Sequence, residues 1–134
     1  MTILIAEDNA LIAMTVESTL SDAGYTVLGP AASTERAIAI AERTPPRIAL
    51  MNIELRDGSS GIELARTLKR RWGTTVIFVT GQVADAREHR DVAIGFLSKP
   101  CTDEALLATV LIADRIIAGE KPDRATFPKG LEIF

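Results

Sequence analysis

Short apolar runs alternate along the chain with longer segments in which apolar residues recur every three or four positions. The runs predict strands at 2–6, 25–29, 48–51, 75–80 and 93–97, and the segments between and after them predict helices at 10–23, 34–43, 61–72, 83–90 and 103–118. Asn9 and Thr102 are suited to cap two of these helices, and Gly24 and Gly73 to end two. Consecutive strand–helix units indicate an α/β fold, a doubly wound five-stranded parallel sheet with helices on both faces.

Composition restricts the class of protein. A chain of 134 residues with 47% hydrophobic and 25% charged residues is expected to form one globular domain. The net charge is -3, and Lys and Arg are scattered without forming a basic patch. We therefore expect no nucleic-acid partner. No apolar run could span a bilayer and no basic leader is present, so we expect no membrane partner and a cytoplasmic location. Cys101, the single cysteine, fits a reducing compartment and is expected to be a packing residue.

The C-terminal end of the chain differs from the rest. We expect the main domain to cover residues 1–119 and residues 120–134 to be an irregular tail. The tail ends in Leu131, Ile133 and Phe134, which are expected either to fold back onto the domain or to contact a partner. The last helix also carries more apolar residues than one face needs, so it is our candidate for an interface.

Polar residues stand where four of the predicted strands end. Glu7 and Asp8 follow the first strand, Asn52 the third, Thr80 closes the fourth and Lys99 follows the fifth. The carboxyl ends of parallel strands meet at one edge of a sheet, where such folds bind ligands. We therefore expect these side chains to lie close together.

The segments LIAEDN, IALMNIELRDGSSGIEL, IFVTG and GFLSKP occur in this order, each at a strand end. In this combination the chain resembles the response-regulator receiver domains of two-component signalling, over about residues 2–118. The resemblance implies the flavodoxin-like (βα)5 fold and a bacterial, non-enzymatic domain without an output domain. It also implies a histidine kinase or phosphotransfer protein as phosphodonor, and a downstream protein target bound through the last helix and neighbouring surface. IFVTG is similar to the FATG pattern of single-domain receivers from alphaproteobacteria.

The resemblance also implies roles for the strand-end residues. A carboxylate at the tip of the third strand accepts a phosphoryl group, and Glu7, Asp8 and the backbone carbonyl of Glu54 hold Mg²⁺ together with it. Lys99 and Thr80 contact the phosphoryl oxygens. Thr80 and Phe96 form the switch, in which the loop after Thr80 moves and Phe96 turns inward.

Asn52 occupies the phospho-acceptor position, and its neutral amide cannot form an acyl phosphate. With Asn52, the formal charges of Glu7, Asp8 and Lys99 sum to -1, whereas a carboxylate at this position would make the sum -2. We therefore expect Mg²⁺ binding weakened by Asn52. Lys99, without its usual carboxylate, is expected to move toward Asp8.

Two explanations for Asn52 remain open. The chain is either a non-phosphorylatable form of a parent that has aspartate there and catalyses its own phosphorylation, or a phosphate-independent pseudo-receiver. The otherwise intact site favours the first. A third alternative is a flavodoxin-like protein in which the loop DGSSG, residues 57–61, holds a ligand phosphate. Neither G-x-G-x-x-G nor a P-loop is present, which argues against dinucleotide or NTP binding.

Overall fold

The structure, a computed structural model, describes residues 1–55, 58 and 60–134. Its strands are β1 (Thr2–Ala6), β2 (Thr26–Ala31), β3 (Ile48–Met51), β4 (Thr75–Thr80), β5 (Gly95–Ser98) and β6 (Leu131–Ile133). Its helices are α1 (Ala10–Asp22), α2 (Thr34–Arg43), α3 (Gly61–Trp72), α4 (Val83–Arg87) and α5 (Asp103–Ile117), with a 3-10 turn η1 at Arg124–Thr126. The predicted strands and helices are therefore present, with ends shifted by up to three residues.

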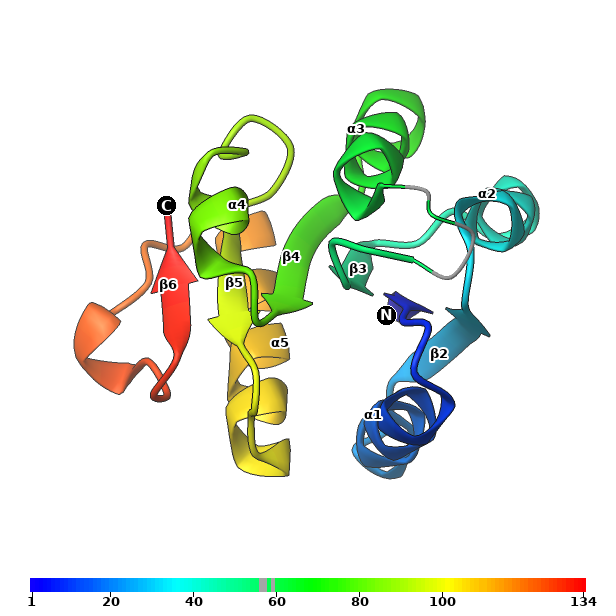
Figure 1. Cartoon of the computed structure of the whole chain (residues 1–134). Helices are drawn as coiled ribbons and strands as arrows, with labels where there is room; N and C mark the ends of the chain where they lie inside the picture. Colours follow the sequence, from blue (N-terminus) through cyan, green and yellow to red (C-terminus); the bar gives the residue numbers. More distant parts are fainter. Residues whose placement is uncertain (56–57, 59) are drawn as a thin grey trace.

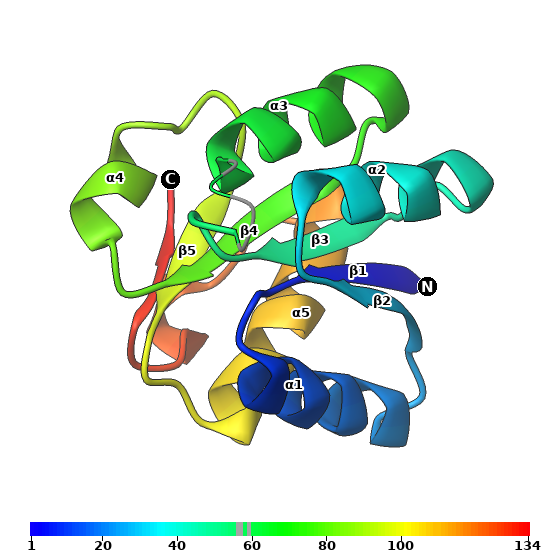
Figure 2. The same ribbon diagram turned by 45° about the vertical axis from the view of Figure 1, so that its right-hand side comes forward.

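The strands form one sheet in the order β2-β1-β3-β4-β5-β6. The first five are parallel, which confirms the predicted α/β fold, and β6 is antiparallel to β5. Helices α2 and α3 cover one face of the sheet, and α1 and α5 cover the other (Figures 1 and 2). The carboxyl ends of β1, β3, β4 and β5 therefore meet at one edge, as the alternation of strands and helices predicts.

Burial of apolar residues on both faces holds the sheet in place. Strand β3 is buried at every position, as expected of a central parallel strand. One core cluster contains residues of α2, α3 and α4, and the other contains residues of α1 and α5. No helix among the described residues is long and apolar enough to cross a membrane.

The helix ends agree with the capping residues read from the sequence. The side chain of Asn9 accepts hydrogen bonds from the backbone N–H groups of Leu11 and Ile12, and Thr102 caps α5 through the N–H of Ala105. Gly73 ends α3 with a φ of 66°, in the left-handed region that glycine adopts at low cost. The cap at Asn9 also fixes how the chain leaves β1, which places Glu7 and Asp8.

The prediction of an irregular tail over residues 120–134 was wrong in part, because Leu131–Ile133 form β6 and add a sixth strand to the five predicted. The tail folds back onto the domain. Gly130, with a φ of 93°, lets its carbonyl accept the N–H of Ser98 at 3.0 Å. Three residues carry too little strand propensity to form a strand by themselves. The exposed edge of β5 supplies the hydrogen-bond partners that make these residues a strand.

Close approach of β6 to β5 depends on Gly95. A Cβ atom at this position would lie 2.1 Å from the carbonyl oxygen of Glu132. We expect Gly95→Ala to lower the free energy of unfolding by about 1–3 kcal/mol, because β6 must shift or detach. Gly81→Ala is the control, since a Cβ there meets nothing within 4 Å, and its effect should stay below about 0.5 kcal/mol. Equal urea denaturation curves for both variants would contradict the expectation.

Candidate functional site

The backbone brings the ends of three neighbouring strands into register. The N–H of Glu7 donates to the carbonyl of Ala31 at 3.0 Å, and the N–H of Asn52 donates to the carbonyl of Ala6 at 2.9 Å. Asn52 therefore follows β3 directly beside the acidic residues that follow β1. This is the edge at which the sequence predicted a site.

Lys99 reaches across the edge from the end of β5 and forms an ion pair with Glu7. Its Nζ lies 2.5 Å from Glu7 Oε1, and the Glu7 side chain is only 7% exposed. Lys99 was expected to move toward Asp8; its ion pair is with Glu7, while its charge also acts on Asp8. The physical reason is burial, because the more enclosed carboxylate has more to lose without a counter-ion.

Asn52 links the two carboxylates through its amide group. Its Nδ2 donates to Glu7 Oε2 at 3.3 Å and to Asp8 Oδ1 at 3.2 Å, while its Oδ1 accepts the N–H of Ile53 at 3.1 Å. A flipped amide would place its oxygen against two carboxylates and its NH₂ group against a backbone donor. The hydrogen-bond network therefore fixes the amide orientation, with NH₂ facing the acidic pair.

The network also changes the acidity of Asp8. Partial burial, the largest single contribution, works to raise the pKa of Asp8, but hydrogen bonds with the side chains of Glu7 and Asn52, a backbone hydrogen bond and the positive charge of Lys99 together hold that pKa below its ordinary value of 3.8. A lowered pKa means that the folded state favours the carboxylate. Groups of this chain therefore stabilise the charged form of Asp8.

Replacing Asn52 should weaken that stabilisation. Asn52→Ala removes an amide donor, so the pKa of Asp8 should rise toward 3.8, which carboxyl-carbon NMR titration would measure. Because the folded pKa is lowered, the contribution to stability is present above the ordinary pKa and is lost as pH falls through the folded value. The acid-unfolding midpoint of the variant should therefore move to higher pH. An unchanged Asp8 titration curve would contradict this expectation.

The donor set does not fit a divalent cation. Mg²⁺ takes oxygen ligands, but Asn52 presents its NH₂ group to the acidic pair and Lys99 already occupies one oxygen of Glu7. Among the described residues, no group of three or more His, Cys, Asp or Glu side chains could hold a metal ion. Receiver domains generally bind Mg²⁺ at this position, whereas in this chain the Lys99 ammonium supplies a positive charge and the neutral Asn52 amide supplies N–H donors.

The remaining predicted site residues lie around this cluster. Thr80 is 1% exposed, its hydroxyl accepts the N–H of Gln82 at 2.9 Å, and its carbonyl accepts the N–H of Lys99 at 3.0 Å. Phe96 is 3% exposed and packs in the core against Phe134 rather than against the cluster.

The loop after β3 is described only in part. Glu54 forms an isolated antiparallel bridge with Ser60. Within the loop DGSSG, Asp57 and Ser59 lie outside the described residues. The prediction that this loop holds a ligand phosphate therefore falls on residues that the structure does not describe. The part of Glu54 as a metal ligand stays a prediction.

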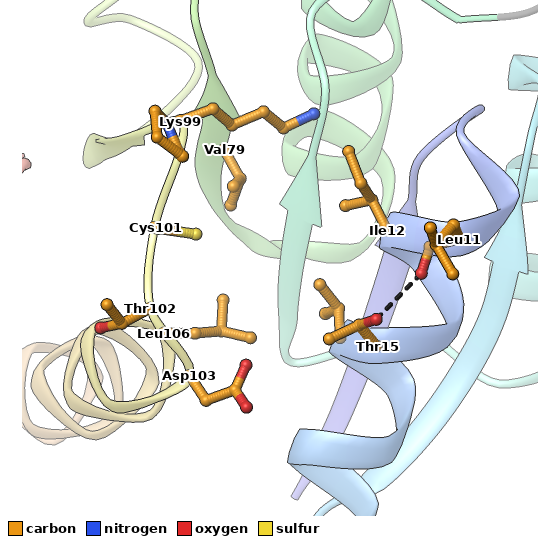
Figure 3. A pocket seen from close by; sticks show the side chains of 11 residues that line it. Leu11, Ile12, Thr15, Val79, Lys99, Cys101, Thr102, Asp103 and Leu106 are labelled. Carbon is orange, nitrogen blue, oxygen red and sulfur yellow. Dashed lines mark hydrogen bonds between the residues drawn. The ribbon is translucent and has the colours of Figure 1, made fainter.

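A pocket of about 480 Å³ lies beside the cluster, between α1 and the segment that leads into α5 (Figure 3). Its lining is largely apolar and includes Ile12, Val79 and Leu106, with Lys99 on the side of the cluster. Cys101 also lines it, and burial raises the pKa of this thiol, which fits the expected packing role.

Sequence reasoning missed Asn9 as part of the cluster. Its backbone N–H donates to Glu7 Oε2 at 3.2 Å, so the same oxygen receives one hydrogen bond from Asn9 and one from Asn52. Asn9 was recognised only as a helix cap. The tight turn between β1 and α1 was the available signal, since it brings this N–H group back toward Glu7.

Comparisons with known proteins identify the family to which this fold belongs. The chain is 40% identical over 79 residues to the phyllosphere-induced regulator PhyR of Methylorubrum extorquens. This alignment covers 58% of this chain and 30% of that protein. It is 31% identical over 116 residues to the transcriptional regulatory protein PdtaR of Mycobacterium tuberculosis. This alignment covers 83% of this chain and 55% of that protein. The chain thus spans between about a third and just over half of these relatives.

Among solved structures, the signal receiver domain of a modulated diguanylate cyclase from Desulfovibrio desulfuricans G20 aligns with a TM-score of 0.79 and 31% identity. The alignment covers 90% of this chain and 98% of that one. The family model for the response regulator receiver domain matches residues 3–111, from β1 into α5. With the acidic pair, Thr80 and Lys99 on the strand ends of this fold, the chain belongs to the response regulator receiver domain family.

Proposed function

We propose that this chain is a receiver domain that signals by binding other proteins and that its acceptor position is closed to phosphoryl transfer. The observation that carries the proposal is the network in which Lys99 pairs with Glu7 while Asn52 donates to both Glu7 and Asp8. The ammonium of Lys99, the amide of Asn52 and both carboxylates are thereby engaged with one another.

The chemistry of Asn52 supports this closure. An amide nitrogen shares its lone pair with the carbonyl, so it is a poor nucleophile, and its two N–H groups are already used on the acidic pair. Mg²⁺ binding is weakened for the same reason, because a cation would have to displace both Lys99 and the amide. The site residues proposed for a parent with a carboxylate at this position are Glu7, Asp8, the carbonyl of Glu54, Thr80 and Lys99, with Thr80 and Phe96 as the switch.

We assign the protein contacts first to α1 and α5. Apart from Met1, the exposed large hydrophobic residues in the described part of the chain all lie on these helices: Leu11, Ile12, Met14 and Leu111. Leu11 and Ile12 line the pocket beside the cluster. A histidine kinase or phosphotransfer protein in the cytoplasm, or a downstream target bound through α5, would bury this surface. Residues 1–119 form the receiver in this proposal, and residues 120–134 are an appendage to it.

A phosphate-independent interaction module is the second candidate. It is favoured by the polar network itself, because among the described residues no buried side-chain nitrogen or oxygen lacks a hydrogen-bond partner. A site that needs neither metal nor phosphate to satisfy its polar groups is stable in one state. In this alternative the surfaces of the domain carry the function and position 52 has only a structural part.

The direct test is to incubate the chain with Mg²⁺ and acetyl phosphate and to measure its intact mass. We expect no phosphoryl adduct and no saturable change in the fluorescence of Trp72, the single indole, during a Mg²⁺ titration. A phosphoryl adduct on the native chain would contradict the closed site. The two candidates are then separated by whether a carboxylate at position 52 restores phosphorylation.

A further inference from the structure

The outer edge of β5 is occupied by the last residues of the chain itself. The β6 strand pairs antiparallel with β5, with Gly95 opposite Ile133, Phe96 opposite Glu132 and Leu97 opposite Leu131. The N–H of Phe134 continues the pairing by donating to the carbonyl of Ile94 at 2.9 Å. Figures 1 and 2 show β6 beside β5, with α4 nearby.

Charge holds the middle of this strand to α4. The guanidinium of Arg87 binds the carboxylate of Glu132 with both ends, Nη2 to Oε1 at 2.9 Å and Nε to Oε2 at 3.1 Å. The hydrogen bonds from Arg87 are the largest effect and hold the pKa of Glu132 below its ordinary value. Burial, the second-largest effect, opposes them, and the charges of Arg87, Arg90 and Arg124 add to the lowering of this pKa. The β5 edge therefore presents a cationic position suited to one carboxylate.

An aromatic position follows the cationic one. The rings of Phe96 and Phe134 are 6.1 Å apart, and the guanidinium of Arg90 lies 5.0 Å from the Phe134 ring centroid. Arg87 lies 5.5 Å from the Phe96 ring centroid. The chain's own terminus thus displays what this edge accepts: an extended segment with a carboxylate and, two residues later, an aromatic side chain between an arginine and Phe96.

The strand is also weakly attached. It has three residues, only Ile133 among them is buried, and the Arg87 and Glu132 side chains are 52% and 34% exposed. Short, partly exposed strands at the edge of a sheet open at low free-energy cost. The edge it covers begins next to the site, because Ser98 pairs with Thr80 and donates to the carbonyl of Gly130.

We propose that the β5 edge, with Arg87, Arg90 and Phe96, is a docking groove for an extended acidic–aromatic segment of a partner protein, and that residues 131–134 occupy it as a competing segment of the same chain. The partner segment forms the same antiparallel pairing after β6 leaves. This proposal goes beyond the proposed function, since it concerns another surface and does not depend on whether Asn52 accepts phosphate.

The test uses full-length chains and two fluorescein-labelled peptides, FPKGLEIF and the same peptide with arginine in place of its glutamate. Glu132→Arg and Arg87→Glu each replace the ion pair between Arg87 and Glu132 with two like charges, and this repulsion should release β6. We expect Glu132→Arg to bind FPKGLEIF about tenfold or more tightly than the native chain does, and Arg87→Glu to prefer the arginine peptide. The combined variant Arg87→Glu/Glu132→Arg restores an ion pair within the chain and should bind both peptides as weakly as the native chain.

Fluorescence anisotropy measures the binding, and circular dichroism with a thermal melt checks that each variant is folded. Folded single variants that bind neither peptide would show that β6 is a fixed part of the fold. Folded single variants that bind both peptides equally would show that the edge does not select for a carboxylate, and either result would overturn the proposal. Tight binding of FPKGLEIF to the native chain would also overturn it, because the edge would then not be closed by β6. A native chain that dimerises in size-exclusion chromatography and rejects the peptide would assign the groove to a second copy instead.

Discussion

Asn52→Asp should convert a chain that acetyl phosphate does not modify into one that gains a single phosphoryl mass in the presence of Mg²⁺. The substitution supplies a nucleophilic carboxylate at the end of β3, beside Glu7 and Asp8, and Lys99 is within reach to neutralise the product. It also removes the amide N–H groups that lie 3.3 and 3.2 Å from the acidic pair. Intact mass spectrometry with and without EDTA measures the gain.

The same variant should be less stable without metal. A third carboxylate replaces a hydrogen-bond donor between two others, which costs about 1–3 kcal/mol. The Tm should therefore fall by several degrees, at about 4 °C per kcal/mol. Added Mg²⁺ should recover the loss in the Asn52→Asp variant and leave the Tm of the native chain unchanged.

Asn9→Asp is the matched control for this experiment. It adds the same charge at a neighbouring exposed residue, where aspartate caps a helix as well as asparagine does. It should keep its stability and take no phosphoryl group. If Asn52→Asp stays unmodified while Mg²⁺ raises its Tm, the phosphate-independent module replaces the closed receiver as the best account of this chain.

Lys99→Met should be the most destabilising single change at the site. It leaves the 7%-exposed carboxylate of Glu7 without its counter-ion, and breaking a buried pair from one side costs about 3–5 kcal/mol. Because Lys99 is itself 22% exposed, we expect about 3 kcal/mol, the lower end of that range. Urea denaturation of the native chain and the variant measures the difference.

Two further variants separate the buried charge from lost packing. Glu7→Gln/Lys99→Met removes both charges and should recover most of the stability. Arg47→Met breaks the ion pair with Asp114, whose side chains are 48% and 44% exposed, and should cost less than about 1 kcal/mol. Equal losses for Lys99→Met and Arg47→Met would mean that burial of Glu7 does not set the strength of its pair.

The edge on which the site residues would meet followed from the sequence alone. Parallel strands linked by helices have their carboxyl ends on one side, and this predicts one shared edge for Glu7, Asp8, Asn52, Thr80 and Lys99. The capping of α1 by Asn9 was equally local, since a cap depends on residues within one helical turn. These features rest on short sequence distances and on a regular alternation of elements.

The partners of each group depended on the tertiary structure. The missing carboxylate at position 52 led us to expect Lys99 to move toward Asp8, but Glu7 is the buried carboxylate and forms the ion pair with the ammonium. Strand β6 was not predicted, because three residues carry too little strand propensity and their hydrogen-bond partners on β5 lie more than thirty positions away. The sequence determined the five parallel strands and the edge that carries the polar residues, whereas only the packed sheet, through burial and a free strand edge, decided which charges pair and where residues 131–133 lie.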